Sequence, residues 1–205
     1  MNATFLIRGM AIGLSIAAPV GPIGVLCIRR SVAGGMWAGF ASGMGAATAD
    51  AAYGAVAGFG LTAVSGFLVR GQSWLALAGG AFLCVLGVRT FLAKPSAEAA
   101  GAQGGRFLGA YASTFLLTLA NPATILSFVA VFAALGLGAS VGYAAATSMV
   151  LGVFLGSALW WLALCGGIGL ARARIGPGAL RLVNRVSGVV LVSFGLLALA
   201  RALAG

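Results

Sequence analysis

The 205-residue sequence contains no histidine and only two acidic residues, Asp50 and Glu98. Histidine is the commonest transition-metal ligand and the usual general base near neutral pH. The three cysteines, Cys27, Cys84 and Cys165, stand far apart without a C-x-x-C pair, which is typical of packing residues. A hydrolytic enzyme would need paired acids, a Ser/His pair or a metal. The sequence therefore predicts a protein that is not an enzyme and that uses no cofactor and no metal.

Charge of either sign is also scarce, at 7% of the chain against 61% hydrophobic residues. A soluble domain carries about 25% charged residues because its surface faces water. The twelve basic residues punctuate apolar runs, a pattern of topology anchors that disfavours nucleic acid as a partner. The composition therefore predicts an all-α integral membrane protein whose surface faces the lipid bilayer.

The charges divide the chain into about six transmembrane helices, with five as the main competitor. The expected spans are Gly9–Ile28, about Trp37–Leu61, Gly71–Val88, two helices within Phe107–Ala171 separated near Gly136–Gly142, and about Val186–Ala200 after a basic loop at Arg172–Arg185. Nine basic residues then fall in the loops after spans 1, 3 and 5, and three on the other side. The positive-inside rule favours cytoplasmic loops there and both termini outside.

Two stretches of the chain resemble each other, Gly35–Tyr53 and Gly142–Trp160. Their alignment sets Asp50 against Ser157 and Tyr53 against Trp160, and a proline-interrupted helix precedes each stretch. We therefore predict one transporter domain over 1–205, with repeat 1 at about 1–93, a loop at about 94–106 and repeat 2 at about 107–205. Three helices per repeat force opposite orientations, and inverted repeats of this kind place a transporter's site near the membrane midplane.

The chain has 34 glycines, and small residues recur at four-residue spacing. The two series are Gly9, Gly13, Ala17 and Gly21, and then Gly35, Gly39, Gly43 and Ala47. In lipid this spacing lets helix backbones approach closely. The pattern predicts tight helix packing and leaves a homodimer open.

Asp50 is the most informative single residue, because a carboxylate at the centre of a transmembrane helix costs about 2.5–3.5 kcal/mol. No lysine or arginine is expected within the hydrocarbon part of a span to neutralise it. Asp50 is therefore expected to be protonated, hydrated in a cavity or paired with a cation that comes and goes. The alternative is a protonated side chain that is hydrogen-bonded across helices, for instance to Asn121 or Thr118.

Prolines interrupt the first and fourth helices. Pro19 and Pro22 flank Gly21 in the first, and Asn121-Pro122 lies within the fourth. Each proline lacks an N–H and disfavours the helix interior by about 3 kcal/mol, and irregular backbone at membrane depth is tolerated where it lines a polar cavity. Simple kinks are the alternative. The predicted site for substrate or proton comprises Asp50, Pro19, Gly21, Pro22, Asn121, Pro122, Tyr53 and Thr118.

These motifs, in order Pro19-Val20-Gly21-Pro22, Gly35 to Asp50 and Asn121-Pro122, resemble those of the LysE-type amino-acid exporter family (LysE/RhtB), which includes homoserine/threonine and arginine exporters. The resemblance covers essentially the whole chain. It implies a multi-pass protein of the bacterial inner (plasma) membrane that exports amino acids. One difference is Ala123, where the family often has lysine, so the substrate's identity is not inherited.

The leading interpretation is a secondary active exporter of an amino acid or a similar small amine-bearing metabolite, with a proton as coupling ion or the membrane potential as driving force. Asp50 would receive the substrate ammonium or the proton, and one repeat would rock against the other. A membrane thiol–disulfide relay is a second possibility, because Cys27 lies near Pro22. A cation or metal exporter is a third, although one intramembrane acid is a poor ligand set for a dehydrated divalent ion.

Overall fold

The computed structural model describes residues 2–19, 21–59, 71–93, 103–121, 124, 127–128, 142–171 and 177–204. Within these residues every regular element is a helix. The helices are α1 (Ala3–Ala17), α2 (Pro22–Gly34), α3 (Met36–Gly58), α5 (Gln72–Leu92), α6 (Gln103–Leu119), α8 (Tyr143–Ala171) and α9 (Pro177–Ala204). A helix satisfies its own backbone N–H and C=O groups, as a chain in lipid must.

Three of the described helices are long and apolar enough to cross a membrane, over Ser73–Leu92, Tyr143–Ala171 and Gly178–Leu203. A fourth crossing results if α1 and α2, which bend by 82° at their break, form one span. Helix α3 has 23 residues, which is about 34 Å at 1.5 Å per residue, but its small residues and Asp50 make it less apolar. Its contacts with α1, α2, α6 and α8 explain this composition, because a helix enclosed by neighbours needs little lipid-facing surface. The all-α membrane fold is confirmed, whereas the six-span inverted repeat stays a prediction.

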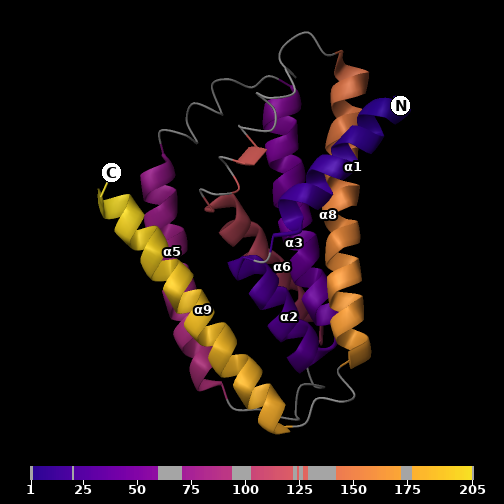
Figure 1. Cartoon of the computed structure of the whole chain (residues 1–205). Helices are drawn as coiled ribbons and strands as arrows, with labels where there is room; N and C mark the ends of the chain where they lie inside the picture. The colour runs from indigo at the N-terminus through magenta and orange to yellow at the C-terminus, as the bar shows by residue number, and fades with distance from the viewer. Residues whose placement is uncertain are drawn as a thin grey trace.

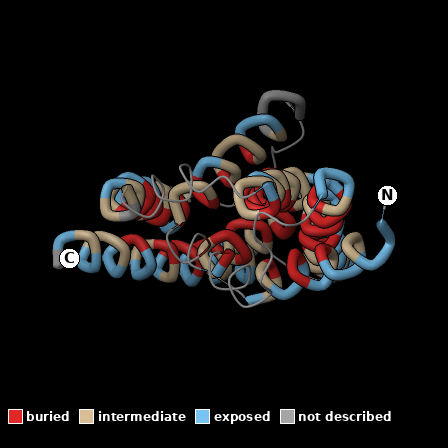
Figure 2. The backbone as a smooth tube through the Cα atoms, turned by 90° about the horizontal axis from the view of Figure 1, so that it is seen from above, coloured by how far each residue is buried: buried red, intermediate tan, exposed pale blue. Residues whose placement is uncertain are grey.

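The helices form two groups that meet at α2 (Figure 1). Helices α5 and α9 lie side by side, while α3 packs between α8 and α6, and α1 packs on α8. Helix α2 contacts α3, α8 and α9 and so connects the groups. Seen from above, the buried residues gather where the helices face one another and the exposed ones on the outer faces (Figure 2). We call the end of the bundle where α2, α5 and α8 finish and α3, α6 and α9 start the basic end, because Arg29, Arg30, Arg89, Arg181 and Arg185 lie toward it.

The first hydrophobic segment is interrupted near Pro19 and Pro22, as the sequence predicts, but it extends beyond the expected bounds Gly9–Ile28. It is longer, and it is two helices: α1 begins at Ala3 and α2 continues to Gly34. Pro22 takes the first position of α2 after the N-cap Gly21, a place where the missing N–H of proline has no helical partner to lose. The break therefore restarts the helix within the bundle, and Arg29 and Arg30 belong to α2 and not to a loop.

The last helix also starts earlier than the expected Val186. Helix α9 begins at Pro177 and runs to Ala204, so Arg181 and Arg185 lie on the helix and not in the expected basic loop. Proline again suits the first helical position. The expected break near Gly136–Gly142 lies outside the described residues apart from Gly142, which immediately precedes α8.

Helices α1 and α8 pack closely through glycines at four-residue spacing, the kind of contact that the sequence predicts. A Cβ added at Gly9 would lie 2.2 Å from the Met149 carbonyl oxygen of α8, and one at Gly13 would lie 2.1 Å from that of Val153. Gly152 and Gly156 of α8 face the α1 backbone equally closely. Helices α1 and α8 therefore touch backbone to backbone, in the manner of small residues at four-residue spacing in lipid.

Gly35 alone joins α2 to α3. Its φ of 89° lies in the region that side chains with a Cβ rarely adopt. This turn reverses the chain at the basic end, so that α3 runs back past α2 and brings Asp50 level with the break between α1 and α2.

Candidate functional site

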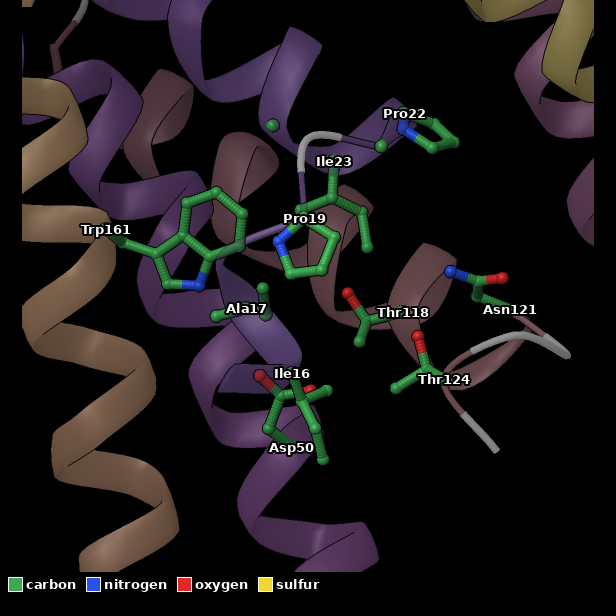
Figure 3. Close-up of a pocket in the computed structure, with 13 residues that line it drawn as sticks. Ile16, Ala17, Pro19, Pro22, Ile23, Asp50, Thr118, Asn121, Thr124 and Trp161 are labelled. Atoms are coloured by element: carbon green, nitrogen blue, oxygen red, sulfur yellow. The ribbon is translucent and has the colours of Figure 1, made fainter. Parts of the chain in front are cut away.

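A cavity of about 70 Å³ lies between the two ends of the α1–α2 break and the helices α3, α6 and α8 (Figure 3). Its lining residues are Ile16, Ala17, Pro19, Gly21, Pro22, Ile23, Gly24, Ala46, Asp50, Thr118, Asn121, Thr124 and Trp161. Pockets for drug-sized ligands measure roughly 300–1,000 Å³. This cavity instead has room for a few waters or the polar head of a small molecule. Six of the eight residues of the predicted site line it; Tyr53 does not, and Pro122 lies outside the described residues.

Asp50 lies in α3 with 3% of its surface exposed. Its Oδ2 accepts a hydrogen bond of 2.7 Å from the Ser157 hydroxyl of α8, and the Trp161 indole N–H donates to that hydroxyl over 3.1 Å. Both donors are neutral, and no lysine or arginine is placed against Asp50 among the described residues. The carboxyl group is therefore held in position without being neutralised. The expected partner Asn121 or Thr118 is not the one found.

The interrupted helix presents two opposite helix ends to the cavity. Ala17 ends α1 and Pro22 begins α2, and both line it. A helix C-terminus carries partial negative charge and an N-terminus partial positive charge. No side chain caps the start of α2 at Gly21, so the first backbone N–H groups of α2, at Ile23 and Gly24, are free of a capping partner. One cavity thus has a negative region at Asp50 and α1 and a positive region at α2.

The end of α6 supplies the polar wall opposite Asp50. In Figure 3, Thr118, Thr124 and Asn121 lie together on the side away from Trp161. The Thr118 hydroxyl donates to the Thr114 carbonyl within α6 over 2.8 Å. Asn121 N–H donates to the Thr118 carbonyl and Thr124 N–H to the Asn121 carbonyl. Pro122 itself lies outside the described residues.

Tyr53 does not line the cavity. Its hydroxyl donates a hydrogen bond of 2.6 Å to the Leu119 carbonyl at the end of α6, and its ring packs on Phe128 with centroids 5.6 Å apart. Tyr53 therefore fixes the end of α6 relative to α3.

A comparison with known protein families identifies the chain's family. Residues 14–202 match the family described as LysE type translocator. That range covers both interrupted segments and every residue that lines the cavity. The chain belongs to the LysE type translocator family. No curated protein and no solved structure matches the chain.

This translocator also contains a half-buried cation that sequence reasoning missed, Arg30 of α2. The Arg30 guanidinium donates to Ser42 of α3 and to Ser113, Thr114 and the Ala110 carbonyl of α6, at 2.7–3.0 Å. A continuous span counted from Gly9 puts Arg30 beyond the membrane core. Once the helix restarts at Pro22, Arg30 lies only eight residues later, about 12 Å along α2. The paired prolines were the signal that could have revealed this.

The cysteines of the translocator lie apart from the cavity. Cys27 of α2 and Cys165 of α8 belong to one core cluster with 0% exposure each, and all three thiols are free. The side chains of Cys27 and Cys165 interact with each other, but neither lines the cavity that holds Asp50. No group of three His, Cys, Asp or Glu side chains gathers within the part of the chain that the structure describes, so the metal-exporter alternative gains no support.

Proposed function

We propose that this LysE type translocator is a secondary active exporter of amino acids or similar small amine-bearing metabolites, driven by proton exchange or the membrane potential. The observation that carries the proposal is Asp50, a buried carboxyl group that lines a cavity at an interrupted helix and has neutral donors as its described partners. Intramembrane acids in such places mark ion and substrate pathways. Asp50 binds the substrate ammonium or the counter-transported proton.

The cavity's opposite charges suit a zwitterion. The ammonium lies toward Asp50 and the C-terminal end of α1, and the carboxylate lies toward the N-terminal end of α2. Thr118, Thr124 and Asn121 provide neutral hydrogen-bonding groups on the facing wall. The small volume of about 70 Å³ accommodates the amino and carboxylate groups better than a large side chain.

The alternating-access part of the proposal draws support from paired contacts. Helix α1 packs on α8 as α6 packs on α3, which is the pattern expected if α1 corresponds to α6 and α3 to α8. The repeat alignment sets Asp50 against Ser157, and these two side chains are hydrogen-bonded. Equivalent positions of an inverted repeat meet only near its pseudo-twofold axis, and a site there can be reached from either side as the halves rock.

Transport by the purified protein tests this proposal. Vesicles with an imposed pH gradient or membrane potential would be offered labelled L-alanine, L-threonine, L-leucine, L-lysine and L-arginine. We expect wild type to move at least one of them, and Asp50→Asn to lose proton coupling and at least tenfold in rate, since about 1.4 kcal/mol of lost transition-state stabilisation is a factor of ten. Glu98→Gln makes the same chemical change at the only other acid and is the matched control.

Two results would contradict the proposal. A wild-type protein that moves no member of the panel would refute amino-acid export. Unchanged rate and coupling in Asp50→Asn would refute the assigned role of Asp50 while leaving export intact.

A further inference from the structure

Arg30 lies directly beneath the cavity, on its basic-end side. Two of its partners precede a cavity-lining residue by one helical turn on the same helix: Ser42 precedes Ala46, and Thr114 precedes Thr118. Four residues of helix rise about 6 Å. The guanidinium therefore lies about one helical turn from the cavity lining, between the cavity and the basic end.

The hydrogen bonds of Arg30 join three helices. Nη1 donates to Ser42 Oγ over 2.7 Å, and to the Ala110 carbonyl and Thr114 Oγ1 over 3.0 Å each, while Nη2 donates to Ser113 Oγ over 2.9 Å. Each of the three hydroxyls in turn donates to a backbone carbonyl of its own helix. We call Arg30 with these four acceptors the Arg30 latch, because it ties α2 to α3 and α6 on this side of the cavity.

Every acceptor in the latch is neutral. A guanidinium removed from water is strongly stabilised by a carboxylate, which it binds in a planar, bidentate manner. The chain has only two acids. Asp50 is bound by Ser157, and Glu98 lies outside the described residues. The described part of the chain therefore provides no carboxylate for Arg30. A substrate in the cavity would lie about one helical turn from its guanidinium.

We propose that Arg30 is the specificity-determining residue for the substrate's carboxylate and the closure of the cavity toward the basic end. Without substrate, Arg30 holds α2 against α3 and α6 through neutral acceptors. A substrate carboxylate that leaves the N-terminal end of α2 and moves toward the basic end replaces those acceptors, which frees α2 on this side and opens a route from the cavity to the basic end. Substrates are then molecules that carry both an ammonium and a carboxylate. This inference rests on the proposed export function.

Arg29 provides a matched control on the same helix. Its Nε donates to Asn184 Oδ1 of α9 over 3.2 Å, and Asn184 in turn donates to the Ala93 carbonyl after α5. Arg29 therefore ties α2 to the other helix group and makes no described contact with the cavity. Arg29→Gln and Arg30→Gln each remove one cation from α2, but Arg29→Gln leaves the Arg30 latch intact.

The carboxylate part is tested by competition. Uptake of the best-transported amino acid of the panel would be measured against the unlabelled amino acid and against its carboxamide, which keeps the size but lacks the charge. We expect wild type and Arg29→Gln to prefer the carboxylate by about 10- to 100-fold, the range for a charge-assisted pair. Arg30→Gln should bring the ratio near one, and Arg30→Lys should keep part of it. A preference unchanged in Arg30→Gln overturns the assignment.

The closure part is tested by labelling, which does not depend on transport. Ala46 lines the cavity with 1% exposure, so Ala46→Cys, with the three native cysteines replaced by alanine, reports on access. A membrane-impermeant thiol reagent would be added to right-side-out and to inside-out vesicles. We expect Arg30→Gln to raise the labelling rate about tenfold or more from one face only, since one hydrogen bond to a charged group shifts an equilibrium by about that factor. Arg29→Gln should not change it.

A second variant keeps the test decisive if Arg30→Gln folds poorly. Ser113→Ala with Thr114→Ala removes two acceptors and retains the cation, and the same one-sided increase in labelling is expected. Equal labelling from both faces in these variants and in wild type overturns the latch. A wild type that moves no amino acid of the panel overturns the proposed function, whereas the labelling result still decides whether Arg30 closes the cavity.

Discussion

The crossing of α1 and α8 allows a sharp test of the packing that holds the site. A Cβ at Gly152 would lie 2.2 Å from the Leu6 carbonyl oxygen of α1, and contacts below 3.0 Å essentially never occur for a real Cβ. The obstructing atom is backbone, so it cannot rotate away as a side chain could. Gly152→Ala must therefore push α1 and α8 apart.

The magnitude follows from two opposing effects. Overpacking costs about 1–3 kcal/mol, while alanine in place of glycine favours a helix by about 0.8–1.0 kcal/mol. Gly166→Ala in the same helix receives only the second effect, because nothing lies within 4 Å of its Cβ. We expect the free energy of unfolding of Gly152→Ala to be lower than that of Gly166→Ala by about 1–3 kcal/mol.

Thermal unfolding of the two purified variants in detergent measures this difference. For a protein of this size 1 kcal/mol corresponds to about 2–4 °C in Tm. Transport should fall as well in Gly152→Ala, because α8 carries Ser157 and Trp161 and α1 leads into the cavity. If Gly152→Ala and Gly166→Ala unfold at the same temperature, the backbone contact described here is wrong.

Four further substitutions have specific expected outcomes. Ser157→Ala removes the donor to Asp50 and should lower the transport rate about tenfold, with a smaller loss in Ser157→Thr. Tyr53→Phe loses its bond to the Leu119 carbonyl and should lower unfolding free energy by about 0.5–1.5 kcal/mol without changing KM, because Tyr53 does not line the cavity. Gly35→Ala places a Cβ at φ 89° and should cost about 1–3 kcal/mol in thermal unfolding. Cys27→Ser should retain transport, since its thiol lies away from the cavity; abolished activity would revive the thiol–disulfide alternative.

Features that depend on local chemistry could be predicted from the sequence. A proline lacks its N–H in any environment, so Pro19 and Pro22 alone predict an interruption of the first helix. Asp50 had to avoid lipid for a similarly local reason, and the cavity where these residues meet follows from both constraints. The roles of these residues in transport stay predictions until they are measured.

Features that depend on tertiary geometry could not be predicted in the same way. The polar side chains of the fourth segment, for instance Asn121 or Thr118, are the hydrogen-bond partners that the sequence suggests for Asp50. The structure uses Ser157 of α8 instead, and only the repeat alignment set the two residues against each other. The error at Arg30 arose from counting membrane depth along a straight helix, whereas an 82° bend resets the count.

The same principle governs Asp50, which is buried, and Arg30, which is half-buried. A buried charge is costly unless hydrogen bonds satisfy it. An ion pair within the protein would also neutralise that charge, and a ligand could then no longer pair with it. Asp50 is held by a serine and Arg30 by hydroxyls and a carbonyl, so each charge is stabilised and remains available. Asp50 thus lines the small cavity, and Arg30 lies about one helical turn from its lining, on the side of the basic end. Under the proposal above, a dipolar molecule can use Asp50 and Arg30 in turn, whereas a simple amine or a simple acid can use only one of them.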